Sequence, residues 1–339
     1  MSKILCLGYF DRGNSGDEAF KNAHEWFFGA ENVEFAKAKL TPEQVAGRPL
    51  FLGGGDVVAP FFLDWIPQGV PFSMLGVGLK YEASSLAAMR AKGDALRFSW
   101  FRNRIDVELA RAAGFDCEYT PDIVFSLREA EMPLRPSVSA VVNKIGAGKP
   151  FAVVCLTDHF NSRFESKAVK HNAYLEFFKW ELAEALDEIA REMPLVFLPL
   201  SVYLQHQDAR MHADVVSRMK RQDRTHQITE DLHPIEAISL VRQASHMVSM
   251  KLHGNIYGLL TKRRCVNIGV GRKQLKLYEE AGLQDVSIQP FEMSVRSVTR
   301  AFERSNDADM VSAIGELSDS NYAALLKVRE RLRGELGLA

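Results

Sequence analysis

Short apolar runs alternate with helical patterns over the first 125 residues of the chain. The helical patterns cover 17–28, 83–92 and 104–113, and the apolar runs read "ILCLGY", "RPLFLGGGDVV", "FSMLGVGL", "RFSWF" and "CEYTPDIVFSL". Strands that are buried on both faces of a parallel sheet appear in a sequence as nearly continuous apolar runs. The pattern therefore predicts a parallel sheet built from βαβ units.

The same rhythm resumes after residues 127–150, a stretch with three prolines and two glycines. Helical patterns cover 172–192, 208–219 and 234–244 and begin again near 253, between the runs "FAVVCL", "PLVFLPLS", "THQIT", "HMVSM" and "RCVNIGV". We therefore predict an α/β fold with an N-terminal domain over 1–135 and a C-terminal domain over 148–290. The charged helical patterns of 291–339 are expected to brace the first domain.

Length and charge narrow the possible functions. A chain of 339 residues with 47% apolar residues can build two cores. Its 42 Lys and Arg residues balance 43 Asp and Glu residues, for a formal charge of -1. Because no overall field attracts nucleic acid or an acidic membrane, any recognition of charge must be local.

The cysteines and the N-terminal segment point to a reducing compartment. Cys6, Cys117, Cys155 and Cys265 are scattered without CxxC spacing, and three of them lie in strand-like apolar runs. Lys3 leads directly into a strand-like segment, with no hydrophobic signal-peptide region, and no window is long and apolar enough for a membrane span. We expect a soluble cytoplasmic protein without a metal site.

The first loop resembles neither of the common nucleotide-binding loops. Gly8 and Gly13 have P-loop spacing, but Asn14 stands where that motif needs a lysine for the phosphates. Gly8, Gly13 and Gly16 are five and three residues apart, whereas the dinucleotide fingerprint needs two and three. The loop Gly13–Asp17 can still present backbone N–H groups to an anion.

Other strand ends carry further candidate binding residues, because open α/β sheets bind ligands at the carboxyl ends of their strands. Gly53, Gly54 and Gly55 follow the run "LFL" and precede Asp56. Bare backbone at this point fits two interpretations, contact with a ligand or a tight turn with close packing of strand on helix.

His253 is the strongest candidate for acid–base chemistry. It opens a helical pattern directly after "HMVSM", two residues from Lys251 and two residues before Asn255. A cation, a titratable group and helix N–H donors in one loop suit an anionic substrate. The alternative is a buried histidine that caps the helix. Polar helical or loop patterns give surface or structural roles to His24, His206, His212 and His226.

More cations follow neighbouring strands. Arg272 and Lys273 come after "CVNIGV" and so are expected near Lys251 and His253, where they would suit a small, densely anionic substrate. Arg102 follows "RFSWF" in the other half of the chain. It either faces this cluster across the cleft from the first domain or is a surface arginine at the start of a helix.

Taken in order, the motifs resemble those of the polysaccharide pyruvyl transferase family over roughly residues 4–285. The motifs that carry the resemblance are "GYFDRGNSGDEA", "LGGGDV", "GVGL", "TPDIVFSL", "FLPLS", "SMKLHGNIYGLL" and "GVGRKQLKLYEEAGL". The resemblance implies a fold similar to the GT-B glycosyltransferases, with two Rossmann-like domains facing each other across a cleft.

The resemblance also implies a reaction, the transfer of pyruvate from phosphoenolpyruvate to two hydroxyls of a sugar to form a cyclic ketal. Phosphoenolpyruvate is the donor substrate, and no cofactor is implied. By resemblance His253 is the general acid, and Asp17 or Asp56 orients or deprotonates the sugar hydroxyls, although Asp17 can instead favour the helix N-terminus. The expected substrate-binding residues are Lys251, Arg272, Lys273, Arg102, Asn14, Ser15, Gly16, Gly53, Gly54, Gly55, Asp56 and Asn255. Asp158 and His159 form a further polar pair at a strand end.

Two positions depart from the family pattern, and rival functions stay open. Lys251 replaces the arginine usual before Leu-His, and Asn103 replaces the aspartate usual after Arg102. The rivals are a sugar-nucleotide glycosyltransferase of the same build and a non-catalytic binding protein of polysaccharide assembly. The expected acceptor is a glycan or a lipid-linked oligosaccharide, and an acceptor lipid would bring the protein to the inner face of the membrane.

Overall fold

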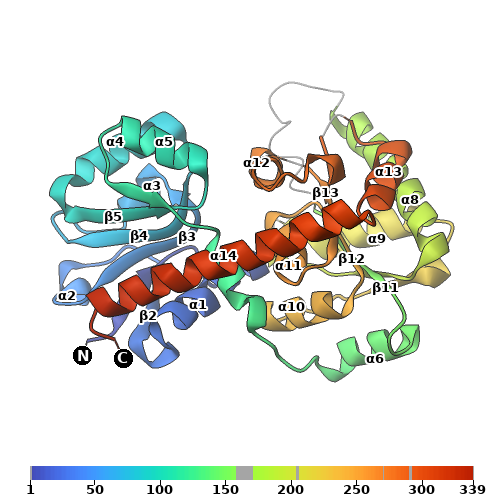
Figure 1. The fold of residues 1–339 in the computed structure, drawn as a ribbon, viewed down its shortest axis with the longest axis horizontal. Helices are drawn as coiled ribbons and strands as arrows, with labels where there is room; N and C mark the ends of the chain where they lie inside the picture. Colours follow the sequence, from blue (N-terminus) through green and yellow to red (C-terminus); the bar gives the residue numbers. More distant parts are fainter. Residues whose placement is uncertain (1, 158–170, 204–205, 270, 290–291, 339) are drawn as a thin grey trace. The chain divides into compact units, whose positions relative to one another are not determined.

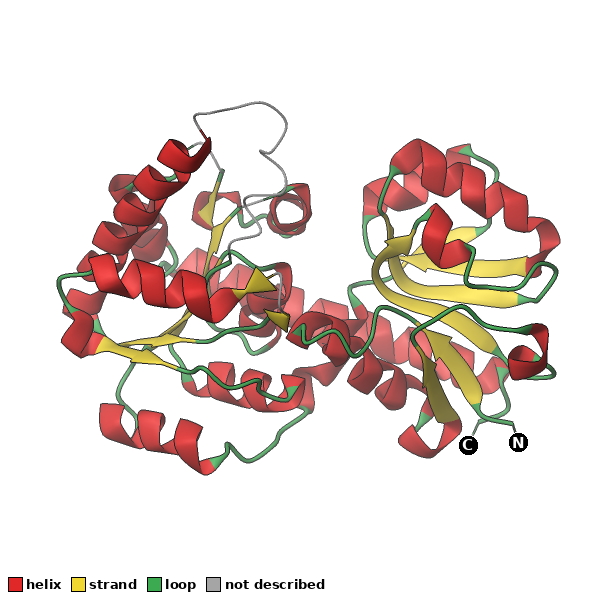
Figure 2. Ribbon diagram, turned by 180° about the vertical axis from the view of Figure 1, so that it is seen from behind, coloured by secondary structure: helices red, strands yellow, loops and turns green. Residues whose placement is uncertain are grey.

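The structure is a computed structural model that describes residues 2–157, 171–203, 206–269, 271–289 and 292–338. Contacts between residues divide the chain into two compact units. Unit 1 comprises Met1–Arg12, Asp17–Glu129 and Ser320–Ala339, and unit 2 comprises Gly13–Gly16 and Ala130–Asp319. Each unit contains a parallel six-stranded sheet with helices on both faces (Figure 1, Figure 2). The predicted α/β architecture with two sheets is thereby confirmed.

The sheet of unit 1 has the order β2-β1-β3-β4-β5-β6. Its strands are β1 (Ile4–Leu7), β2 (Val33–Ala36), β3 (Leu50–Val58), β4 (Phe72–Leu79), β5 (Leu96–Phe101) and β6 (Cys117–Tyr119). Its helices are α1 (Ser15–Phe28), α2 (Pro42–Val45), α3 (Pro60–Leu63), α4 (Glu82–Lys92), α5 (Arg104–Ala112) and the C-terminal part of α14 (Ala308–Glu335).

Apolar side chains fill both faces of this sheet. One core cluster joins Leu5 and Leu52 of the sheet to Phe62, Met89 and Val107 on α3, α4 and α5. Helix α1 covers the opposite face (Figure 1). The strands are continuous apolar runs because both faces are buried.

The run "CEYTPDIVFSL" was predicted as one strand, and this prediction is wrong in its second half. Strand β6 ends at Tyr119, and Ile123–Glu129 form a 3₁₀ helix. Pro121 has no N–H to donate to a ladder, and the Oδ1 atom of Asp122 accepts a hydrogen bond from the N–H of Val124 at 3.0 Å. This local turn competes with strand pairing.

The sheet of unit 2 has the order β11-β8-β7-β12-β13-β14. Its strands are β7 (Ala152–Cys155), β8 (Leu195–Phe197), β11 (Thr225–Gln227), β12 (His246–Ser249), β13 (Arg264–Ile268) and β14 (Ser287–Ile288), and β9 (Val202–Tyr203) pairs with β10 (His206–Gln207) in a small antiparallel hairpin. Its helices are α6 (Pro136–Ile145), α8 (His171–Glu192), α9 (Asp208–Arg218), α10 (Pro234–Gln243), α11 (Leu252–Leu260), α12 (Arg272–Glu280), α13 (Val295–Arg304) and the first part of α14.

Helices α8, α9 and α13 pack on one face of the second sheet and share a core with it. Helix α11 contacts β12 and β13 and packs beside α10. Because these strands are parallel and adjacent, the carboxyl ends of β8, β7, β12 and β13 lie side by side. The loops that precede α9, α11 and α12 begin at these carboxyl ends.

The segment that connects the two sheets along the chain contains a helix that the sequence pattern did not predict. Helix α6 lies inside 127–150 and has Pro136 at its first position, where a fixed φ and a missing N–H cost nothing. Two further segments belong to unit 2 by their contacts, Gly13–Gly16 and residues 292–319.

Candidate functional site

The loop Gly13–Gly16 pairs with the segment that follows β8. The N–H of Ser15 donates to the carbonyl of Leu200 at 2.8 Å, and the N–H of Val202 donates to the carbonyl of Gly13 at 2.8 Å. Asn14 forms an isolated antiparallel bridge with Ser201. Backbone hydrogen bonds thus fix this loop at the carboxyl edge of the second sheet.

Two side chains of the loop stabilise its turn. The Oδ1 atom of Asn14 accepts a hydrogen bond from the N–H of Gly16 at 3.0 Å. The hydroxyls of Ser15 and Tyr257 lie 3.0 Å apart, and the Tyr257 hydroxyl also donates to the carbonyl of Ser15 at 3.0 Å. Both residues are buried, so Ser15 anchors the loop to α11.

Gly16 lies directly against the imidazole of His253. A β-carbon at position 16 would stand 1.9 Å from Nδ1 and 2.3 Å from Cγ of His253. No real β-carbon contact is that short, so any larger residue would displace the ring. His253 itself is half-buried in the first turn of α11, directly after β12.

Lys251, the residue before α11, forms an ion pair with Asp208 at the start of α9. Lys251 Nζ lies 2.6 Å from Oδ2 of Asp208, and the side chains are 10% and 0% exposed. The same Oδ2 accepts hydrogen bonds from the N–H groups of Leu200 at 3.0 Å and Ser201 at 2.8 Å. Asp208 therefore holds both the lysine and the segment that binds the Gly13–Gly16 loop.

His212 lies one helical turn after Asp208 and is also buried. Its Nε2 accepts a hydrogen bond from the N–H of Leu156 at 3.0 Å. Burial lowers the pKa of His212 to about 4, so the ring is neutral and Nδ1 carries the proton. Neither this Nδ1 nor Oδ1 of Asp208 has a hydrogen-bond partner in the part of the chain that the structure describes.

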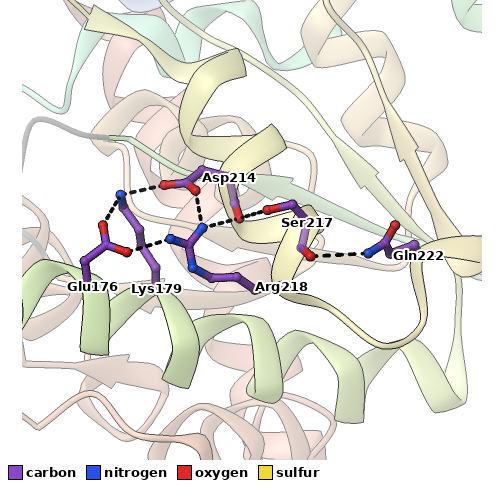
Figure 3. Close-up of polar contacts among 6 residues, drawn as sticks. All are labelled: Glu176, Lys179, Asp214, Ser217, Arg218 and Gln222. Atoms are coloured by element: carbon purple, nitrogen blue, oxygen red, sulfur yellow. Dashed lines mark hydrogen bonds and ion pairs between the residues drawn. The ribbon is translucent and has the colours of Figure 1, made fainter.

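A cluster of ion pairs holds α9 against α8, as Figure 3 shows. Lys179 of α8 contacts Asp214 of α9 at 2.5 Å and Glu176 at 2.9 Å. Arg218 of α9 contacts Glu176 at 2.6 Å and also pairs with Asp214. Exposed pairs of this kind add little stability singly, but a linked set fixes the axis of the helix that carries Asp208.

Asn255, which the sequence suggested as a substrate contact, is fully buried. Its Nδ2 donates to Oδ1 of Asn267 at 2.8 Å, and its Oδ1 accepts from the hydroxyl of Tyr278 at 3.0 Å. Asn267 in turn donates to Ser287 at 2.8 Å. The structure thus places Asn255 in an interior network that connects α11 with β13 and α12.

Arg272 and Lys273 follow β13, as expected, and are the first two residues of α12. Gln274 donates to the carbonyl of Met250 at 3.0 Å, which connects the first turn of α12 to the residue before Lys251. Lys273 is half-buried, and the Arg272 side chain lies outside the described atoms. Asp158 and His159 also lie outside the described residues.

In unit 1 the three consecutive glycines lie inside β3 and pack against α1. A β-carbon at Gly53 would stand 2.1 Å from Nε2 of His24, and one at Gly54 would stand 2.2 Å from Cγ of Phe20. Gly54 and Gly55 have φ values of 80° and 84°, which favour glycine. Of the two interpretations, the structure supports close packing of strand on helix. His24 is fully buried, which lowers its pKa to about 4.

Arg102 pairs with two carboxylates at the carboxyl edge of the first sheet. Its Nη2 lies 2.6 Å from Oδ1 of Asp56, and its Nη1 lies 2.6 Å from Oδ2 of Asp122. Burial disfavours the charge, but Asp56 and Asp122 outweigh it and raise the pKa of Arg102. The side chain is only 5% exposed, which differs from the surface arginine weighed as an alternative.

More acidic and amide groups surround this pair. Asp106 accepts hydrogen bonds from Asn103 Nδ2 at 2.9 Å and from the N–H of Leu79 at 3.1 Å, and a β-carbon at Gly78 would stand 2.5 Å from Oδ1 of Asp56. Three aspartates therefore accompany one arginine. Such an edge offers more acceptors to hydroxyl groups than cations to an anion. Asp17 lies elsewhere, half-buried in the first turn of α1.

Sequence reasoning did not identify Asp208, Asp122 or Asp106, although each lies within a few residues of a strand end or in the first turn of a helix. Asp208 also shares a helix face with His212 by its four-residue spacing. No helix of the described residues is long and apolar enough to cross a membrane. No group of three or more His, Cys, Asp or Glu side chains in those residues could hold a metal ion.

Solved structures with the same architecture are very different in sequence. A putative UDP-N-acetylglucosamine 2-epimerase from Listeria monocytogenes is 10% identical, with a TM-score of 0.65 over 99% of this chain and 97% of that chain. The S. aureus MnaA protein, solved with UDP, is 9% identical, with a TM-score of 0.62 over 100% and 98%. The trehalose-6-phosphate synthase OtsA is 10% identical, with a TM-score of 0.53 over 95% and 83%. The expected similarity to GT-B proteins is confirmed at the level of the fold.

Comparison by sequence gives a family. No curated protein matches the chain at a significant level. The family described as polysaccharide pyruvyl transferase matches residues 16–272, a range that includes Gly16, Asp56, Arg102, Lys251 and His253. Because this range is well over half of the 339 residues, the chain belongs to the polysaccharide pyruvyl transferase family.

Proposed function

We propose that this protein transfers a pyruvyl group from phosphoenolpyruvate to two hydroxyls of a sugar in a cell-surface polysaccharide or its lipid-linked precursor. The observation that carries the proposal is the contact of Gly16 with His253 beside the Lys251–Asp208 pair. It joins a titratable ring, a cation and a helix N-terminus at the edge of a parallel sheet, where ligands of such folds bind. Family membership supports the assignment as an enzyme.

His253 acts as the general acid in this proposal. It donates a proton to the methylene carbon of phosphoenolpyruvate, which leaves a cationic centre at the carbon that bears the phosphate. One sugar hydroxyl attacks that carbon, the bond to the phosphate oxygen breaks, and the second hydroxyl attacks the same carbon. Of the two hydroxyl protons, one returns to His253 and one leaves with inorganic phosphate, so the reaction is balanced.

Lys251 and Lys273 bind the carboxylate and phosphate of the donor, with Arg272 as a further cation. Lys251 keeps a full charge but presents a single point of contact, unlike the planar fork of an arginine. Its pairing with Asp208 fixes the ammonium and lowers the local net charge. We infer that Asp208 is a positioning residue for this lysine.

We assign Asp56 to the binding of the sugar acceptor, because the carboxyl edge of the first sheet is rich in carboxylates. Asp17 is the other proposed base for the sugar hydroxyls. A lipid-linked acceptor would bring the protein to the inner face of the membrane by peripheral contact, and the protein would otherwise work in the cytoplasm.

The test is incubation of the protein with phosphoenolpyruvate and a panel of lipid-linked and nitrophenyl hexosides. Release of inorganic phosphate together with the mass of a pyruvate ketal on one sugar is the expected result. A parallel panel of sugar nucleotides tests the glycosyltransferase alternative. Transfer of a sugar from a nucleotide, or binding of glycan without phosphate release, would overturn the proposal in favour of one of the two rival functions.

A further inference from the structure

Unit 1 contains a cavity that lies at the opposite edge of its sheet from Asp56 and Arg102. It has a volume of about 630 Å³ and is lined by the beginnings of β3 and β4, by Arg97, Phe98 and Trp100 of β5, by the segment between α2 and β3, and by the last turns of α14. That volume lies in the range of pockets that bind small molecules. Substrates of open α/β sheets bind at the carboxyl ends, so this cavity at the amino ends is separate from the proposed active site.

The lining is mainly apolar and includes large rings. Phe51, Phe72, Phe98 and Trp100 come from the three strands, and Leu336 comes from the end of the chain. Burying an apolar ligand against such surface is favourable in proportion to the area removed from water. The apolar part of the lining therefore selects a hydrocarbon chain or ring.

Trp100 adds an unsatisfied donor to this lining. The residue is 2% exposed, and its indole N–H has no hydrogen-bond partner within the described residues. A buried donor without an acceptor costs free energy, so most such groups in proteins are paired. An oxygen atom of a ligand in the cavity would satisfy this group.

The charges at the cavity favour an anion. Arg48, Arg97 and Arg331 line it with a single acidic residue, Glu335. Arg48 pairs with Glu34 at 2.7 Å, and Arg331 pairs with Glu118 and Glu335 at 2.9 Å. Arg97 is exposed and makes no ion pair among the residues that the structure describes.

Arg331 also shapes the wall of the cavity. Its guanidinium lies 5.1 Å from the ring centre of Phe98 and 5.5 Å from that of Trp100. This stacking, together with the two ion pairs, orders the end of α14 over the strand β5. Of the three arginines, Arg97 is thus the one available to a ligand.

We propose that this cavity binds a small anionic amphiphile, a molecule with an apolar chain or ring and a carboxylate or phosphate group. The chain fills the apolar part, an oxygen accepts the hydrogen bond of Trp100, and the negative group binds Arg97. The proposal does not rest on pyruvyl transfer, since the cavity lies within unit 1 and neither Asp56 nor Arg102 lines it.

Calorimetric titration of the full chain with decyl phosphate, below its micelle concentration, tests this binding. Decyl phosphate should bind, whereas inorganic phosphate, decanol and decyltrimethylammonium should bind at least ten times more weakly. Arg97→Gln should weaken the affinity about ten- to a hundredfold, because it removes a charge-assisted contact. Trp100→Phe keeps the apolar surface and should weaken it about two- to tenfold.

Arg90→Gln is the matched control, because Arg90 is an exposed arginine of α4 in the same unit that does not line the cavity. It should leave the affinity unchanged. The proposal is overturned if decyl phosphate does not bind, if decanol binds equally well, or if Arg97→Gln and Trp100→Phe both bind like the unchanged protein.

Discussion

Gly16 and His253 are in contact so close that the imidazole fills the space of a missing side chain. The ring nitrogen Nδ1 would be 1.9 Å from a β-carbon at position 16. The loop that carries Gly16 is fixed by hydrogen bonds to Leu200 and Val202, on either side of the bridge between Asn14 and Ser201, so it has little freedom to move away. The position of the histidine therefore depends on this glycine.

Gly16→Ala tests this dependence. The added methyl should displace the His253 ring, and a shift of about 1 Å in a reacting group can cost on the order of 10² in rate. We expect turnover to fall by about that factor, measured as phosphate release from phosphoenolpyruvate with an acceptor.

Gly315→Ala is the control for Gly16→Ala. Gly315 lies in α14, and a β-carbon there would meet no atom within 4 Å. This variant should keep full turnover and gain stability of about 0.5–1 kcal/mol, since alanine is the better helix former. Normal turnover in Gly16→Ala would contradict the proposed role of the contact.

His253→Ala should remove most of the turnover but leave binding of phosphoenolpyruvate nearly unchanged. A positioned general acid contributes roughly 10²–10⁴ in rate, whereas the affinity for the anion comes from the cations around it. Single-turnover rates and calorimetric titration with phosphoenolpyruvate measure the two effects separately. If both fall together, the ring contributes to binding of the donor more than to proton transfer.

The two sheets could be predicted from the sequence because buried parallel strands such as β1, with the sequence "ILCL", are continuous apolar runs. His253 could be identified as a candidate from the sequence for a similar reason. It lies just after an apolar run, and the carboxyl end of such a strand can be identified without knowing which strands lie beside it. The structure adds the position of Gly16 against the ring and the order of the strands around it.

Interactions between distant residues could not be predicted. Asp208 pairs with Lys251 across 43 positions, and no local pattern marks one as the partner of the other. The three glycines of β3 gave two equally acceptable interpretations, because the side chains that fill their space, Phe20 and His24, come from a different helix. Arg102 was expected to bind an anion, but it pairs with Asp56 of β3 and with Asp122, which follows β6.

Buried neutral histidines should make stability depend on pH. Burial lowers the pKa of both His24 and His212 to about 4 in the folded protein, whereas an unfolded chain binds these protons near pH 6.5. The unfolded state therefore gains protons first as pH falls. The contribution of these two histidines to the free energy of unfolding should be constant above pH 6.5. As the pH falls from about 6.5 to 4, the free energy of unfolding should decrease by roughly 1.4 kcal/mol per pH unit for each histidine.

Urea unfolding of His24→Phe across this pH range checks the effect. His24 lies among Phe10, Phe28 and Phe35, so an aromatic replacement suits the site and the slope should become shallower by one proton. His233→Asn, at the exposed start of α10, keeps a residue able to cap the helix and should retain the original slope. An unchanged slope in His24→Phe would show that this ring is protonated in the folded state.

Chelation should leave the activity intact. Among the described residues no three acidic, histidine or cysteine side chains form a metal-binding group, and the proposed chemistry relies on His253 and lysines. Phosphate release before and after treatment with EDTA, followed by gel filtration, is the measurement. Loss of activity that a divalent cation restores would require a metal in the mechanism.

The Lys251–Asp208 pair allows binding of the donor to be separated from stability. Lys251→Met leaves a fully buried carboxylate without its partner, and Asp208→Asn leaves a nearly buried ammonium. Removal of one partner of a buried pair costs about 3–5 kcal/mol, whereas removal of both costs less than the sum. The double variant should therefore be more stable towards urea than the sum of the single losses predicts.

Binding of phosphoenolpyruvate to the same variants then decides the role of the lysine. If Lys251 contacts the anion, Lys251→Met and the double variant should both lose about ten- to a hundredfold in affinity, although the double variant has recovered stability. Lys262→Met, which removes a surface pair with Asp319, should change stability by less than about 1 kcal/mol and leave the affinity unaltered. A double variant that binds phosphoenolpyruvate normally would restrict Lys251 to a structural role, because its only essential partner would then be Asp208.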